Sequence, residues 1–218
     1  EAALETATGP PSAAAIQALR NQQGTLAEVH FDGQTLSATR PLCIDLGGMA
    51  KGTALERARL VLRERGIGNA LLSVGGSSQL ALGRKGMRPW YIGLRDPQAN
   101  RVFGRLALAP GEAASTSGDY ERGYTRDGRR YHHILDPRTG TPTTEAASVT
   151  VLARDAELAD AASTALMVAG PARFREICAA LGIRDALLVT STGKLLTTPG
   201  MAFRLRRDND GQLPLAVL

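Results

Sequence analysis

The chain has 218 residues, of which 43% are hydrophobic, and carries a formal net charge of +5. This apolar content is enough for a packed core and excludes a largely disordered chain. The basic residues are scattered and only 4% of residues are aromatic, which argues against a nucleic-acid-binding surface with a basic stripe and interleaved aromatics. No apolar run approaches the roughly 20 residues that span a bilayer.

The first third of the chain predicts a loose segment, two helices and a hairpin. In chain order we expect a lead-in over residues 1–11, a helix from Ser12 to Arg20, strands at 26–31 and 34–39, a strand or extended piece at 42–46 and a helix over 49–65. Asp32-Gly33 is the dipeptide of a tight hairpin turn. Apolar residues three and four positions apart predict the second helix, and Gly66 ends it.

The rest of the chain predicts mainly strands. They are expected at residues 70–74, 79–82, 90–95, 102–108, 131–135, 148–153, 186–190 and 194–197. Asp155 is placed to cap a helix to about Ala169, and a further helix begins at Pro171, after a break at Gly170. Strands outnumber helices without regular βαβ alternation. The fold class expected is therefore α+β, with mixed or antiparallel sheets and a few packed helices in a single domain over residues 1–218.

The two cysteines, Cys43 and Cys178, are far apart in the sequence and lack the spacing of a metal site. This pattern favours two buried free thiols, and a disulfide between them stays open as the alternative. The cysteines do not indicate a redox compartment.

A glycine-rich segment, DLGGMAKG, occupies residues 45–52, where the second helix begins. Glycines at such a junction let the backbone approach a ligand closely, and a helix N-terminus favours anions. Lys51 adds a positive charge there. The spacing matches neither of the two familiar phosphate-binding glycine motifs, GxGxxG and GxxxxGK[ST]. The alternative interpretation is a glycine turn that precedes a packed helix.

Two of the three histidines, His132 and His133, are adjacent in the segment YHHILDPRTG at residues 131–140, which follows STSGDY at 115–120. Neighbouring side chains of a strand point to opposite faces, so at most one of the two histidines faces a given site. A histidine titrates near neutral pH and can take a proton from a hydroxyl nucleophile. The alternative is a hydrogen-bonded histidine beside a structural turn.

The segment LADAASTAL at residues 158–166 places Asp160 and Thr164 four positions apart, on one face of a helix. A carboxylate and a hydroxyl, with backbone carbonyls nearby, form a hard oxygen site of the kind that Mg²⁺ prefers. The alternative is an aspartate bonded to a nearby threonine on an alanine-rich packed helix.

Together, and in this order, the three segments resemble the ApbE flavin transferases, whose sequences carry DLGGxAKG, STSG-Y…HHxxDPxTGxP and LADAxSTA stretches. The similarity runs from about Leu42 to Gly170, and more loosely to the C-terminus. It implies an ApbE-like, T-fold-like α+β architecture and a reaction on FAD. The family usually carries a longer N-terminal part with further flavin contacts, and this sequence starts just after it. In many relatives an aspartate follows Gly75-Gly76, where this chain has Ser77-Ser78.

The resemblance also implies roles for individual residues. For FAD, the matching positions are Asp45, Lys51 and the backbone of Leu135. For the general base, the matching position is His133. For Mg²⁺, they are the Gly48 carbonyl, the Asp160 and Thr164 side chains and a backbone oxygen of Ser163. His132 matches a less constant neighbour of the base. Gly48, Asp160 and Thr164 are therefore expected to converge on one cation-sized point, and His133 to open onto the same cleft.

The function that the resemblance implies is Mg²⁺-dependent transfer of FMN from FAD to a Thr or Ser hydroxyl of an acceptor protein, with release of AMP. The acceptor would be a protein such as a redox-pump subunit, and the enzyme would be exported to the periplasmic side of a bacterial inner membrane. Two other functions stay open. One is a Mg²⁺-dependent FAD pyrophosphatase, in which water attacks and FMN and AMP are released, and the other is a non-catalytic flavin-binding descendant of the enzyme. The sequence indicates no oligomeric state.

Overall fold

The computed structural model describes residues 9–22, 24–207 and 213–218. Its centre is a seven-stranded sheet of order β16-β14-β13-β12-β7-β4-β3, in which only the β14–β16 pair is parallel. The strands are β3 (Ala70–Val74), β4 (Ser78–Leu82), β7 (Ala113–Gly118), β12 (Ala146–Ala153), β13 (Asp185–Thr190), β14 (Leu195–Thr197) and β16 (Leu215–Val217). This mixed, mainly antiparallel sheet confirms the α+β prediction.

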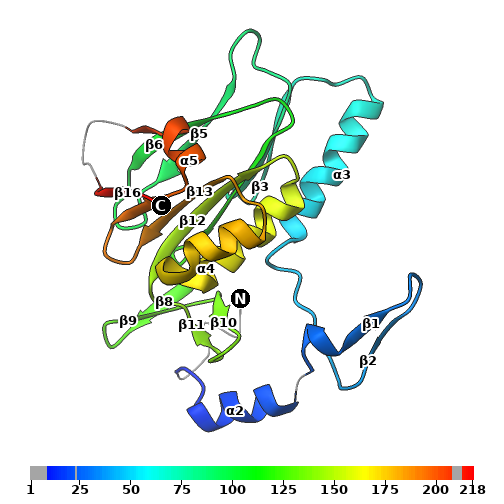
Figure 1. Cartoon of the computed structure of the whole chain (residues 1–218), viewed down its shortest axis with the longest axis vertical. Helices are drawn as coiled ribbons and strands as arrows, with labels where there is room; N and C mark the ends of the chain where they lie inside the picture. Colours follow the sequence, from blue (N-terminus) through cyan, green and yellow to red (C-terminus); the bar gives the residue numbers. More distant parts are fainter. Residues whose placement is uncertain (1–8, 23, 208–212) are drawn as a thin grey trace.

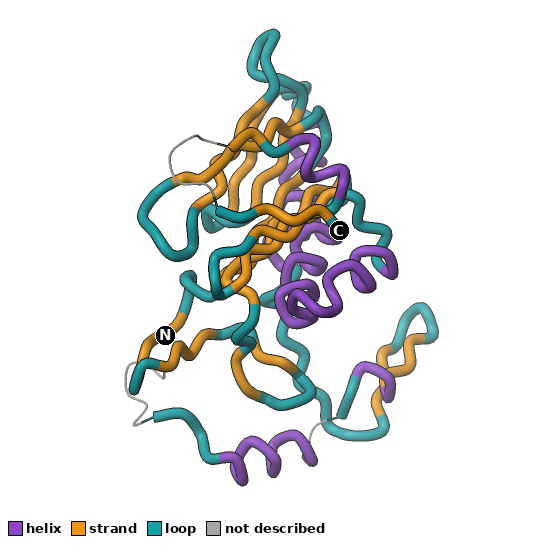
Figure 2. The backbone as a smooth tube through the Cα atoms, turned by 60° about the vertical axis from the view of Figure 1, so that its left-hand side comes forward, coloured by secondary structure: helices purple, strands orange, loops and turns teal. Residues whose placement is uncertain are grey.

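Two helices, α3 (Ala50–Glu64) and α4 (Ala156–Ala180), cover one face of this sheet (Figures 1 and 2). Buried apolar side chains fill the space between the helices and the strands: Leu55, Leu166, Phe174, Leu80, Val149, Val151 and Leu188. The break predicted at Gly170 is a kink inside α4, where Gly170 has a φ of 66° and Pro171 follows. That φ is left-handed, so a glycine suits the position.

The other face of the sheet carries a second layer. It consists of β5 (Trp90–Arg95), β6 (Val102–Leu108) and β15 (Arg206–Arg207), which form a three-stranded sheet, and of the short helix α5 (Pro199–Arg204). A second core cluster fills this side, with Leu94, Leu106, Met201, Ala81, Leu187 and Val189 among its members. Because neighbouring residues of β13 point into two different cores, this strand is apolar at each of its four central positions, 186–189.

Smaller elements lie at the lower end of the molecule in Figure 1. They are α2 (Ala13–Gln22), the 3-10 turn η1 (Leu26–Glu28), the hairpin of β1 (Val29–Phe31) and β2 (Leu36–Ala38), the hairpin of β8 (Gly123–Arg126) and β9 (Arg129–His132), and the pair β10 (Leu135–Asp136) and β11 (Thr141–Pro142). In both views α2 lies apart from the seven-stranded sheet.

Several sequence-based expectations differ from the structure. Residues 42–46 form no strand, and the predicted strand at 131–135 is divided between β9 and β10. The first strand of the early hairpin begins only at Val29, because a 3-10 turn occupies the residues before it. Most of the predicted lead-in, residues 1–8, lies outside the described residues.

The two cysteines are free, so the disulfide alternative is wrong, and they differ in environment. Cys178 is buried, and burial raises the pKa of its thiol to about 11. Cys43 is exposed, which contradicts the prediction of two buried thiols, and the segment around it pairs with no strand among the described residues. Among the described residues, no helix has the length and apolarity required to cross a membrane.

Candidate active site

Asp160 is the centre of a buried polar network between α4 and the sheet. Alternation along β4 and β7 turns Ser78 and Ser115 toward α4, and the two are direct partners in the sheet. Asp160 Oδ1 accepts hydrogen bonds from Ser115 Oγ at 2.8 Å and Ser78 Oγ at 3.3 Å, and Oδ2 accepts from the Gly52 N–H at 3.0 Å. Lys51 Nζ lies 3.1 Å from Oδ1. The carboxylate is only 1% exposed, and these partners offset the cost of burying its charge.

A second group of hydroxyls lies one helical turn further along α4. Ser117 Oγ, on β7, is 2.8 Å from Ser163 Oγ and 3.0 Å from Thr164 Oγ1. Ser163 Oγ also donates to the Asp160 carbonyl at 2.9 Å. The glycine-rich segment lies against this turn, since a Cβ on Gly48 would be 3.4 Å from Thr164 Oγ1. Gly48, Asp160 and Thr164 are thus brought together from distant parts of the chain.

Gly52 permits the close contact between α3 and α4 that assembles this network. A Cβ at Gly52 would lie 2.3 Å from the Ala156 carbonyl oxygen and 2.6 Å from the Glu157 Cα. Both are backbone atoms at the start of α4, so they cannot move aside as a flexible side chain would. The glycine is therefore required for the Gly52 N–H to reach Asp160.

We expect Gly52→Ala to lower the free energy of unfolding by about 1–3 kcal/mol, because the methyl group pushes the two helices apart. Urea denaturation measures this. Gly68→Ala is the matched control, since a Cβ there would meet nothing within 4 Å, and it should change the free energy by less than about 0.5 kcal/mol. Equal stability of the two variants would contradict the helix contact described above.

A cavity of about 830 Å³ opens beside this network. Its lining includes Asp45, Gly48, Lys51, Gly75, Ser77, Thr116, Ser117, Glu121, Arg122, His133, Leu135 and Thr164. Six of the eight site residues predicted from the sequence are therefore on one cavity wall. The other two, Asp160 and Ser163, lie behind it, bonded to the lining residues Lys51 and Ser117. The roles of the eight residues stay predictions.

The two adjacent histidines differ sharply in environment. His132 is 7% exposed, and its Nε2–H donates to the Thr143 carbonyl at 2.7 Å while Nδ1 accepts from the Ile134 N–H at 3.3 Å. Both ring nitrogens of the neutral His132 side chain thus have a hydrogen-bond partner. His133 is exposed and lines the cavity, with Nδ1 3.3 Å from the Arg122 carbonyl. A proton on Nδ1 of His133 would leave its Nε2 free to accept one.

Burial lowers the pKa of His132 below its usual value of 6.5, so the unfolded chain binds a proton more readily than the folded one. The protein therefore has its full stability at pH values above the pKa of this histidine in the unfolded chain. It loses stability as the pH falls from there toward the pKa of His132 in the folded protein. We expect the free energy of unfolding to decrease between about pH 7 and pH 5. Urea titrations at several pH values measure how the free energy of unfolding changes with pH. In His132→Gln the part of this change that comes from the histidine should vanish. An unchanged slope would contradict the assignment.

The oxygen donors near Asp160 suit a hard cation that is bound together with a phosphate. No group of three or more His, Cys, Asp or Glu side chains within the described ranges could hold a metal ion. Mg²⁺ needs no such cluster, because it commonly binds to one or two carboxylates, waters and substrate phosphates. The Asp160 carboxylate and the Thr164 hydroxyl, with the Gly48 backbone nearby, fit that description.

The supporting hydroxyls Ser78, Ser115 and Ser117 were not assigned roles from the sequence. Ser115 and Ser117 lie in the STSGDY segment, where no strand is predicted from the sequence. Because they are two positions apart, a strand there would place both on one face, and this spacing is the signal that could have identified them. The Ser78 hydroxyl, in the Ser77-Ser78 pair that follows Gly75-Gly76, donates a hydrogen bond to Asp160.

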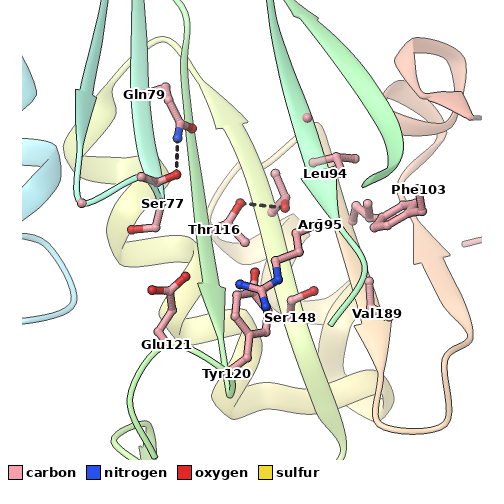
Figure 3. A pocket seen from close by; sticks show the side chains of 15 residues that line it. Ser77, Gln79, Leu94, Arg95, Phe103, Thr116, Tyr120, Glu121, Ser148 and Val189 are labelled. Carbon is pink, nitrogen blue, oxygen red and sulfur yellow. Dashed lines mark hydrogen bonds between the residues drawn. The ribbon is translucent and has the colours of Figure 1, made fainter. Parts of the chain in front are cut away.

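A smaller cavity of about 220 Å³ lies across the sheet, between β7 and β5. Figure 3 shows Arg95 extending toward Tyr120, and the guanidinium carbon lies 5.0 Å from the centroid of the tyrosine ring. Thr116, which points away from α4, bonds Thr150 at 2.9 Å. This cavity shares Gly75, Ser77, Thr116 and Glu121 with the large one. The two cavities therefore meet at the same end of the sheet.

Comparison with known proteins agrees with the motifs and with their arrangement in space. The ApbE family model matches residues 3–188. The chain belongs to the ApbE family. This ApbE chain is 42% identical to the FAD:protein FMN transferase of Rhodobacter capsulatus over 187 residues. It is 37% identical to the FAD:protein FMN transferase of Vibrio cholerae over 163 residues.

Solved ApbE structures share the fold. The ApbE protein of Thermotoga maritima superposes with a TM-score of 0.82 and 34% identity, covering 92% of this chain and 65% of that one. The flavin transferase ApbE of Vibrio cholerae gives a TM-score of 0.79 and 30% identity, with 91% and 64% covered. The match to the Rhodobacter capsulatus protein covers 85% of this ApbE chain and 36% of that protein. The chain thus spans only part of the length of its relatives.

Proposed function

We propose that this chain transfers FMN from FAD to a threonine or serine hydroxyl of an acceptor protein, with Mg²⁺ bound and AMP released. The observation that carries the proposal is the meeting of Lys51, Thr164 and His133 at one large cavity, with Asp160 paired to Lys51 behind its wall. Relatives named FAD:protein FMN transferase, up to 42% identical, support it.

The cavity has the size and charge that the FAD diphosphate requires. Its volume of about 830 Å³ falls within the range of cofactor sites, and Lys51 supplies an ammonium group at its wall. The start of α3 borders the cavity at Ala50, so the positive end of the helix dipole lies beside an anion bound there. Asp45 and the Leu135 backbone are the proposed contacts to the rest of the flavin nucleotide.

Asp160, Thr164, the Gly48 carbonyl and a backbone oxygen of Ser163 would hold Mg²⁺. Bound there, the ion would neutralise the charge that develops on the phosphate oxygens. The ammonium of Lys51, which pairs with Asp160 in this structure, would contribute to the same neutralisation.

His133 is the proposed general base. Its Nε2 takes the proton of the acceptor hydroxyl while the hydroxyl oxygen forms a bond to the FMN phosphorus. The bond between that phosphorus and the bridging oxygen breaks, and AMP leaves with the bonding pair. Atoms and charge balance: the acceptor gains FMN as a phosphoester, and the proton moves to the imidazole.

FAD pyrophosphatase activity is the second candidate, and the exposure of His133 favours it. Water that reaches Nε2 could replace the acceptor hydroxyl, which would give free FMN and AMP. A non-catalytic role is less well supported, since Asp160, Thr164 and His133 are all retained at one site. We further propose that the chain acts on the periplasmic side of a bacterial inner membrane, as the family resemblance implies.

AMP release tests the proposal. The chain is incubated with FAD, an acceptor domain and Mg²⁺, and nucleotides are separated by chromatography. We expect AMP to accumulate, to stop when a chelator removes Mg²⁺, and to resume when excess Mg²⁺ is added. Absence of AMP from a folded chain with Mg²⁺ present would favour the non-catalytic alternative.

A further inference from the structure

A second cavity also has His133 in its lining. It has a volume of about 450 Å³ and is enclosed by the start of α2, the β8–β9 hairpin and the β10–β11 pair. Tyr124 and Tyr131 form part of its wall as a stacked pair, with ring centroids 5.2 Å apart and an angle of 14° between the planes. Pro11, Ile16 and Pro142 add apolar surface. We call this cavity the tyrosine pocket.

His133 and Leu135 line both the tyrosine pocket and the large cavity. The proposed reaction has two substrates, and a general base must contact the hydroxyl from which it takes the proton. The large cavity contains Lys51 and the proposed metal-binding residues, so it suits the diphosphate of FAD. A hydroxyl that enters from the tyrosine pocket would reach the same imidazole.

The lining of the tyrosine pocket determines which ligand it accepts. No Asp, Glu, Lys or Arg belongs to the lining among the described residues, so a phosphate or a charged side chain would lose its water there without gaining a partner. Aromatic rings and prolines form the kind of apolar surface on which extended peptide segments bind. The occupant that fits is a stretch of small or apolar uncharged residues.

From these observations we propose that the tyrosine pocket binds the acceptor protein, through the uncharged residues that flank the threonine or serine to be modified. This inference rests on the proposed transferase function and adds to it the place and the chemistry of acceptor recognition. The pocket thereby places the acceptor hydroxyl beside His133, while FAD occupies the large cavity.

A pair of tryptophan variants on α2 tests this. Ala13 lines the pocket and Ala14 does not, and both are exposed, so either substitution should leave the fold intact. The probe is a fluorescein-labelled peptide with one central threonine between glycines and with alanine or leucine elsewhere, and its binding is followed by anisotropy. Ala13→Trp should weaken peptide binding by about tenfold or more, because the indole fills the pocket. Ala14→Trp should bind the peptide within about twofold of the wild type.

FAD affinity, measured through flavin fluorescence, is the second readout. We expect both variants to bind FAD as the wild type does. If Ala13→Trp weakens FAD binding as much as peptide binding, the pocket belongs to the flavin and the proposal is overturned. It is also overturned if the wild type does not bind the peptide, or if both variants bind it equally well. Peptide binding requires no catalysis, so a chain that binds the peptide but releases no AMP contradicts the transferase function alone.

Discussion

Replacing Asp160 with asparagine is expected to reduce FMN transfer by about 10²- to 10³-fold, measured as AMP release at saturating FAD. The substitution keeps the shape of the side chain and removes its negative charge. Lys51 then loses the negative charge with which it pairs, and the proposed Mg²⁺ site loses its single carboxylate. Half-maximal activity should also require a higher Mg²⁺ concentration. The buried donors around Asp160 lose part of their acceptor, so the free energy of unfolding should fall by about 1–3 kcal/mol.

Asp155→Asn is the matched control for this variant. Asp155 caps the same helix by accepting hydrogen bonds from the N–H groups of Glu157 and Leu158, and asparagine caps helices about equally well. Its activity should therefore stay within about twofold of the wild type, and its stability within about 0.5 kcal/mol. If Asp160→Asn were as active as Asp155→Asn, the buried network would be structural only.

The second large effect is expected for His133→Ala. Loss of a general base lowers the rate by about 10²- to 10⁴-fold, and AMP release in the presence of an acceptor measures it. FAD affinity should stay within about twofold, because the proposed role of this imidazole is to take the acceptor proton. Stability should change little, since the side chain is exposed and its ring makes one long hydrogen bond, at 3.3 Å.

His30→Ala is the control for the histidine variant. His30 is exposed on β1 and lines none of the cavities described above, so its removal should leave the rate unchanged. A His133→Ala variant that transfers FMN at the wild-type rate would show that the acceptor hydroxyl loses its proton elsewhere. A loss of FAD binding that equals the loss of rate would instead make His133 a flavin-binding residue.

Elements with a strong hydrophobic pattern could be predicted from the sequence, and β7 could not. α3 buries one face and β12 buries two, so the spacing of their apolar residues predicts a helix and a strand. Both elements were placed correctly. The β7 segment AASTSG contains a single residue of a type enriched in strands, Thr116, among alanines, serines and a glycine. It is a strand because β4 and β12 pair with it on either side, which is a tertiary effect. Its small side chains let α4 pack closely.

The opposite error occurred at residues 42–46. Leu42, Ile44 and Leu46 alternate as they would in a strand, yet no strand within the described part of the chain pairs with them. Ile44 is 50% and Leu46 is 56% exposed, so the pattern does not reflect burial in this structure. Alternation predicts a strand only where a pairing partner is available, and a partner is not visible in the local sequence.

Candidate site residues within distinctive motifs could be named from the sequence, whereas the groups that contact them could not. Lys51 and His133 lie in motifs that resemble those of a family, and the structure places both on one cavity wall. Ser78 and Ser115 became recognisable only through their hydrogen bonds to Asp160. The tyrosine pocket is formed by segments distant in sequence, so no local pattern could reveal it.

Attachment of FMN to a protein hydroxyl at this cavity is tested by the intact mass of an acceptor domain after incubation with the chain, FAD and Mg²⁺, followed by peptide mapping. We expect a mass increase of one FMN on a single threonine or serine, which disappears when that residue is replaced by valine. AMP and free FMN without any change in acceptor mass would rule out the transfer and identify the chain as a hydrolase.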